Sequence, residues 1–158
     1  MKLPSVGDVL APVLARVAVE KRPLLIAAAE RMAGQRYRGW ARDAADADRK
    51  AGLETCADRE EEIARRVESL FTDAGSLQRE LTAALPDLAE VNQSLFAPYT
   101  IEEQFRIQAQ GERLGAATWR SFAKHAESQQ TAEVFESCAV LEEESATFLE
   151  SLLASCQR

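Results

Sequence analysis

The chain is poor in the residues that interrupt helices. Its 158 residues include only seven glycines and five prolines. These shortages argue against a fold of many short strands and tight turns, because such turns depend on glycine and proline. Alanine, glutamate, leucine and arginine are abundant instead, which predicts an all-α protein. At this length we expect one domain over residues 1–158, large enough to bury an ordinary core.

Clustered basic charge and long apolar runs are also scarce. The net charge is −7 and the arginines are interleaved with acids, so we expect no nucleic-acid partner, since phosphate binding needs a clustered basic face. The first 22 residues hold a short apolar run broken by Asp8 and Pro12. That run is too short to span a membrane and is a poor signal peptide. We expect residues 1–22 to form an N-terminal helix or arm, and no membrane partner.

Cysteine is rare as well. The chain has three cysteines, and no two of them have CxxC spacing. An odd number without that spacing argues against a disulfide framework and fits a reducing compartment. We therefore expect a cytoplasmic protein.

The sequence does contain a repeat, at an offset of 82 residues that takes residue 30 to residue 112. Residues 30–41 read ERMAGQRYRGWA and residues 112–123 read ERLGAATWRSFA. Residues 56–71 read CADREEEIARRVESLF and residues 138–153 read CAVLEEESATFLESLL. The matches predict a duplicated pair of helices.

The repeat divides the chain into helix pairs over residues 23–71 and 105–153, joined by a crossover over residues 72–100. The run DADRK and Gly52 predict the turn within the first pair. Thr100, with a glutamate three residues later, is a capping-box pattern and predicts the start of the third long helix.

Each of the four repeated segments keeps a glutamate in the middle of an apolar stripe at helical spacing. Carboxylates buried together need protons, metal cations or arginines, because an unpaired buried charge is expensive. The alternative is that the edge of each stripe is exposed to solvent and the glutamates reach out to Arg31, Arg59 or Arg113. We expect them to converge in the interior. The four are Glu30, Glu60, Glu112 and Glu142.

The residues around two of these glutamates resemble a known family. Glu30 and Glu112 are each followed by a small residue three positions on and by an aromatic residue seven positions on, Tyr37 and Trp119. Over roughly residues 23–155 the chain resembles the rubrerythrin-like branch of the ferritin-like superfamily. The resemblance implies a ferritin-like four-helix bundle with a long crossover between the second and third helices.

The second and fourth helices of that family usually read Ala-x-x-Glu-x-x-His-Ala. Here Ile63 and Ser145 stand where the histidines after Glu60 and Glu142 would be, and the only histidine, His125, lies far along another segment. The family's two irons are each held by carboxylates and one imidazole, so the resemblance implies loss of a normal di-iron centre. Carboxylates alone favour hard cations such as Mg²⁺, Ca²⁺ or Mn²⁺.

These observations favour a degenerate bundle that acts as a binding or structural protein, as a homodimer, rather than as an enzyme, with no tightly bound cofactor. The first alternative is a carboxylate-only site at the four glutamates that binds manganese or iron weakly and supports peroxide or oxygen chemistry. The second is a pocket for an unidentified small molecule in the former metal site. Its expected lining residues are Tyr37, Cys56, Ile63, Trp119, Cys138 and Ser145.

Overall fold

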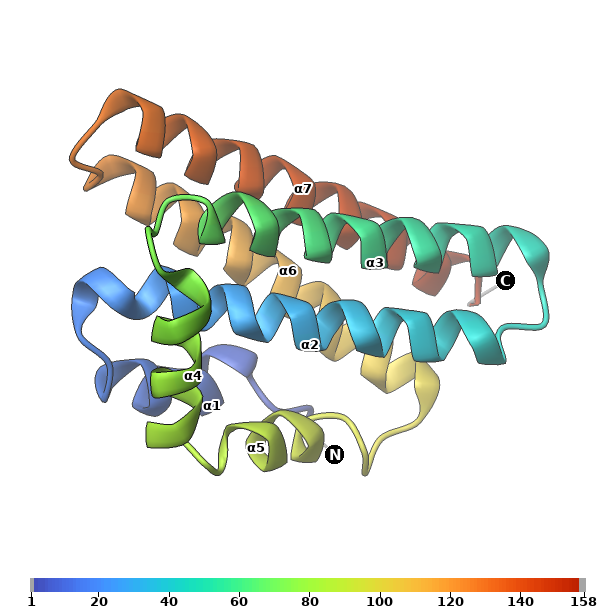
Figure 1. Cartoon of the computed structure of the whole chain (residues 1–158). Coiled ribbons are helices and arrows are strands. Elements are labelled where there is room, and N and C mark those ends of the chain that lie inside the picture. The colour runs from blue at the N-terminus through green and yellow to red at the C-terminus, as the bar shows by residue number, and fades with distance from the viewer. Residues whose placement is uncertain (1, 157–158) are drawn as a thin grey trace.

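The computed structural model describes residues 2–156, which form helices and no strand, so the all-α prediction is confirmed (Figure 1). Four of the helices are long and follow one another in two pairs, with shorter helices before the first pair and between the pairs. Among the described helices, none combines the length and the apolar character needed to cross a bilayer. The helices are α1 (Val6–Ala15), α2 (Arg22–Asp43), α3 (Ala47–Glu68), α4 (Ala74–Ala84), α5 (Leu88–Ser94), α6 (Ile101–Lys124) and α7 (Gln129–Ser155), with a 3₁₀ turn at Val19–Lys21.

The four long helices form two hairpins. Helix α2 packs along α3 and helix α6 packs along α7, and the hairpins meet mainly where α3 packs against α7. Figure 1 shows α4 and α5 in the connection between the hairpins, beside α2, with α1 nearby. Helix α1 packs on α6 and α4 packs on α2, so the short helices cover one side of a helical bundle.

Local residues set the starts of the long helices. Thr100 and Glu103 form the expected capping box, in which the Thr100 side chain accepts from the Glu103 backbone N–H and the Glu103 carboxylate accepts from the Thr100 backbone N–H. Asp46 caps α3 and Ser128 caps α7 in the same side-chain-to-backbone manner.

The expected turn at DADRK and Gly52 is wrong. Helix α3 already begins at Ala47, because Asp46 satisfies a backbone donor of its first turn. Gly52 lies inside the helix, where a Cβ would come within 2.2 Å of the Phe148 ring on α7. The glycine therefore permits a close approach of α3 to α7 rather than a change of direction.

The apolar core has two main parts, one at each end of the bundle. Trp40 packs edge-on against Phe105 at one end, and Trp119 stacks on Phe135 at the other. In each long helix, the repeated glutamate lies in sequence between residues of the two parts. The carboxylates therefore lie at mid-bundle with apolar side chains on both sides.

Candidate functional site

The repeated charged residues outside the apolar stripes make matching contacts in both hairpins. Arg31 pairs with Glu68 at 2.6 Å, and their counterparts 82 residues later, Arg113 and Glu150, pair at 2.8 Å. A second matched set is Arg38 with Glu61 and Arg120 with Glu143.

These contacts argue against the alternative in which the four central glutamates reach Arg31, Arg59 or Arg113. Arg31 and Arg113 are used in the matched pairs, and Arg59 lies 3.2 Å from Glu144. In the described part of the chain, no arginine or lysine forms an ion pair with any of the four central glutamates. Their charge has to be met in another way.

The four central glutamates are buried. Glu30 is 8% exposed, Glu60 is 0% exposed, and Glu112 and Glu142 are each 1% exposed. The structure brings oxygens of Glu30, Glu60 and Glu142 to within 4.8 Å of one another. These three residues come from α2, α3 and α7, so the cluster joins both hairpins.

Glu112, on α6, lies beside this cluster and is held by neutral donors. The Tyr37 hydroxyl donates to its Oε1 at 2.5 Å, and Gln108 Nε2 donates to the same oxygen at 2.8 Å. Its second oxygen is buried without a hydrogen-bond partner. One oxygen of Glu112 is thus fixed, while the other has no partner.

Glu142 is held by Trp119, the counterpart of Tyr37 in the repeat. Trp119 Nε1 donates to Glu142 Oε1 at 2.8 Å. Gly115 makes room for this carboxylate, because a Cβ there would lie 2.5 Å from the same oxygen. The aromatic residue and the small residue of the sequence pattern therefore both position Glu142.

Glu60 differs from Glu112 and Glu142 in having no hydrogen-bond donor. Both of its oxygens are buried and lack a hydrogen-bond partner. Leaving a buried polar group unpaired costs about 1–3 kcal/mol, and more when it is charged. A pair of carboxyl groups can share a hydrogen bond only when one holds a proton, so Glu60 requires either a proton or a cation.

The site favours proton uptake when no cation is present. Burial, followed by the charges of Glu112 and Glu30, raises the pKa of Glu60 well above 4.5. Burial, followed by the charges of Glu30 and Glu60, does the same to the pKa of Glu142. Burial also raises the pKa of Glu30. These groups share protons among themselves rather than titrating independently.

The available donors suit a hard divalent cation. Carboxylate oxygens are the ligands that Mn²⁺, Mg²⁺ and Ca²⁺ favour. Ile63 and Ser145, each three residues after a cluster glutamate and each fully buried, supply no nitrogen ligand. The Ser145 hydroxyl is buried without a partner. The residues therefore fit an all-oxygen cation site and do not fit a di-iron centre ligated by imidazoles.

The residues expected to line a pocket lie in the interior. Burial raises the pKa of the Cys56 thiol to about 11 and that of Cys138 to about 12, so both thiols are neutral near neutral pH and poor soft ligands. The main cavity near the carboxylates is lined by other residues. All six expected residues are fully buried, namely Tyr37, Cys56, Ile63, Trp119, Cys138 and Ser145.

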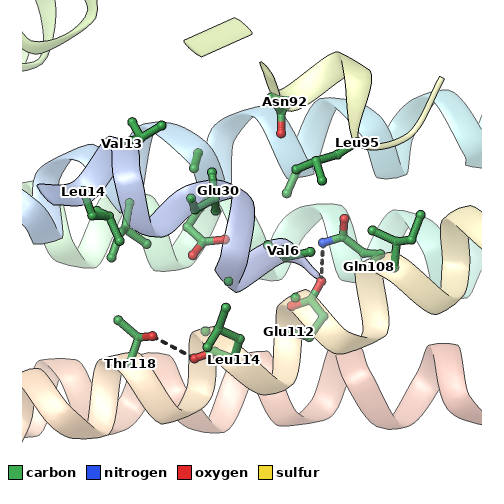
Figure 2. Close-up of a pocket in the computed structure, with 18 of the residues that line it drawn as sticks. Val6, Val13, Leu14, Glu30, Asn92, Leu95, Gln108, Glu112, Leu114 and Thr118 are labelled. Atoms are coloured by element: carbon green, nitrogen blue, oxygen red, sulfur yellow. Dashed lines mark hydrogen bonds between the residues drawn. The ribbon is translucent and has the colours of Figure 1, made fainter. Parts of the chain in front are cut away.

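That cavity has a volume of about 270 Å³ and lies beneath α1, with walls from α2, α5 and α6 (Figure 2). Glu30, Glu112 and Glu142 contribute to its lining. Figure 2 shows the side chains of Glu30, on α2, and Glu112, on α6, in the space beneath α1.

A polar chain closes one side of the cavity. Arg36 donates to Gln108 at 2.6 Å and to Asn92 at 2.8 Å, and its guanidinium lies over the Phe96 ring. Sequence reasoning did not assign these residues to the site. Gln108 lies one turn before Glu112 on the same helix face, which was the available signal. Arg36 and Asn92 carry no such signal, because their contacts depend on how α5 packs.

Comparisons of the chain with models of protein families, with curated proteins and with solved structures found no match. The resemblance to rubrerythrin-like proteins therefore rests on the residue pattern. The geometry of the site does not depend on that resemblance.

Proposed function

We propose that the protein is a degenerate ferritin-like bundle that binds a hard divalent cation, such as Mn²⁺, through Glu30, Glu60 and Glu142. The observation that carries this proposal is the state of Glu60. Its two fully buried oxygens lack any donor, while carboxylates from two other helices lie within 4.8 Å. A cation would satisfy all three groups at once.

The ferritin-like assignment is supported by connectivity. A hairpin, a long connection and a second hairpin, with one inward glutamate in each long helix, is the arrangement used by carboxylate-bridged metal proteins of that type. The matched ion pairs of the two hairpins support an origin by internal duplication.

The surrounding residues would position the ligands rather than bind the ion. Tyr37 and Gln108 fix one oxygen of Glu112, and Trp119 fixes one oxygen of Glu142. Such contacts orient carboxylates and help determine metal affinity. Because the cluster glutamates hold protons when no cation is present, cation binding would release protons and would tighten as pH rises.

A second candidate is a structural bundle in which protons alone neutralise the glutamates. The buried Ile63, at a position where the family pattern has an imidazole, favours it. On this alternative, the cluster would be a remnant of a former metal site.

The two candidates are separated by metal analysis and titration. We expect protein purified without chelator to bind Mn²⁺ saturably in calorimetry, and Glu60→Gln to lose affinity at least about tenfold, the scale expected when a metal-site residue is altered. Glu54→Gln is the matched control, because Glu54 is exposed on the same helix.

Failure of the parent to bind Mn²⁺, Mg²⁺, Ca²⁺ or Fe²⁺ would leave the structural bundle as the explanation. Equal Mn²⁺ affinity in Glu60→Gln would show that the ion binds elsewhere. A purified sample with close to two irons per chain and the absorption of an oxo-bridged pair would overturn the expectation that a normal di-iron centre is lost.

A further inference from the structure

We propose that the cavity beneath α1 binds a short aliphatic amine, with its ammonium group at the carboxylates and its hydrocarbon chain along α1. This site goes beyond the proposed cation site, although the two share Glu30 and Glu142. The proposal stands on the shape and lining of the cavity and on the carboxylate oxygens at its inner side.

The walls of the cavity suit a hydrocarbon chain. Helix α1 supplies Val6, Leu10, Val13 and Leu14, and apolar side chains of α2, α5 and α6 line much of the rest. Figure 2 shows Val6, Val13 and Leu14 extending from α1 around this space. Water along these apolar walls would find few partners, so an apolar group is favoured there.

The inner side of the cavity is acidic. Glu30, Glu112 and Glu142 all line it, and Glu112 Oε2 has no hydrogen-bond partner. An ammonium group has three N–H donors and no acceptor, so it can donate to the unpartnered Glu112 Oε2 and to the nearby Glu30 carboxyl group. An anionic head group would find no positively charged partner among these three side chains.

Arg36 also lines the cavity, but its guanidinium is already used. It donates to Gln108 and Asn92 and lies 3.7 Å from the centre of the Phe96 ring. These contacts hold the guanidinium of Arg36 against one wall of the cavity, so it is not free to bind an anionic ligand. The cavity therefore selects for positive charge at its carboxylate side.

Size limits the ligand further. At about 270 Å³ the cavity lies near the lower end of the range for small-molecule sites. It suits a molecule with on the order of ten non-hydrogen atoms. Octylamine is a probe of this size, and 1-octanol and octanoate have the same chain with a neutral and an anionic end.

We expect calorimetry on the full chain to show saturable binding of octylamine, at least tenfold tighter than that of 1-octanol or octanoate. Ala29 lines the cavity and its neighbour Ala28 does not. Ala29→Leu should fill the space and weaken octylamine binding at least tenfold while leaving Mn²⁺ binding unchanged. Ala28→Leu is the matched control and should leave both unchanged. Ala11→Phe, on α1, repeats the test if Ala29→Leu fails to fold.

Absence of octylamine binding, unchanged binding in the filled variants, or tighter binding of octanoate would each overturn the proposal. Binding of Mn²⁺ without octylamine would remove the amine site alone. Binding of octylamine without Mn²⁺ would support the amine site and remove the cation site alone. If both bind, we expect Mn²⁺ to compete with octylamine, because they share two carboxylates.

Discussion

Glu60 has both carboxylate oxygens buried without a donor, and its neighbours in the cluster are also acids. Burial followed by the charges of Glu112 and Glu30 raises the pKa of Glu60 in the folded state. A carboxyl that holds its proton more tightly when folded contributes stability at low pH. That contribution is lost as pH rises above its ordinary value of 4.5 towards the raised value.

We therefore expect the free energy of unfolding of metal-free protein to fall as pH rises from about 4.5 into the neutral range, and to fall less steeply in Glu60→Gln. At the upper end of this range the variant should be the more stable, by on the order of 1–3 kcal/mol, because its neutral amide removes a buried charge and can donate to a neighbouring carboxylate. Urea denaturation with chelator present measures both slopes. Glu54→Gln should follow the parent, and identical slopes in all three proteins would contradict the expected role of Glu60.

The sequence predicted burial of the four glutamates because each lies in a stripe of apolar residues. Such a stripe is a local pattern, since its residues recur at helical spacing. It did not predict their individual partners. Tyr37 donates across to Glu112 of the other hairpin, whereas its counterpart Trp119 donates to Glu142 within its own hairpin. Such differences depend on which neighbouring helix each side chain points toward. A repeat in the sequence carries no information about that.

At the scale of the helices, Gly52 of α3 lies directly against the Phe148 ring of α7. We expect Gly52→Ala to destabilise the fold by about 1–3 kcal/mol, because the added methyl group would overlap the phenyl ring. This should outweigh the usual gain from replacing a helical glycine by alanine. The midpoint of thermal or urea unfolding measures the difference.

Gly39 of α2 is the matched control. A Cβ there meets no atom nearer than 3.8 Å, so Gly39→Ala should stabilise the protein by about 0.5–1 kcal/mol. Stabilisation of the same size by Gly52→Ala would mean that α3 and α7 are not so closely packed.

Gly52 also shows why the first turn was misplaced. Glycine and a polar run usually mark a turn, and the local sequence around DADRK fits that rule. The requirement for glycine comes instead from Phe148, nearly a hundred residues away in sequence. Thr100 was predicted correctly because its capping box is complete within four consecutive residues.

For the molecule as a whole, the carboxylate cluster is where the two hairpins share a site. Glu30 and Glu60 come from one hairpin and Glu142 from the other, so a bound cation would connect them. We expect Mn²⁺ to slow hydrogen exchange in α2, α3, α6 and α7 together. Amides that exchange by global unfolding should slow about a hundredfold when free Mn²⁺ is about 100 times its dissociation constant.

Hydrogen exchange followed by mass spectrometry, with and without Mn²⁺, makes this measurement. Glu60→Gln should show no added protection. Protection confined to one hairpin would contradict a shared site.

The sequence could not predict the cavity, because the cavity exists only once distant helices have packed together. Its walls come from α1, α2, α5 and α6, which are far apart along the chain. The apolar residues of α1 were visible as a short run, but nothing in that run states which helices it covers. The position of α1 follows from tertiary packing on α6.

The contact between Trp119 and Glu142 gives the site an intrinsic optical reporter. The Trp119 indole is fully buried, stacks on Phe135 and donates its only N–H to that carboxylate. Indole fluorescence responds to charge near the ring. The emission of Trp119 should therefore change when Glu142 gains or loses a proton. The other indole, Trp40, donates to the neutral Gln104 at the opposite end of the bundle. The chain thus holds both a signal and an internal reference, and occupancy of its centre can be followed by light without a label.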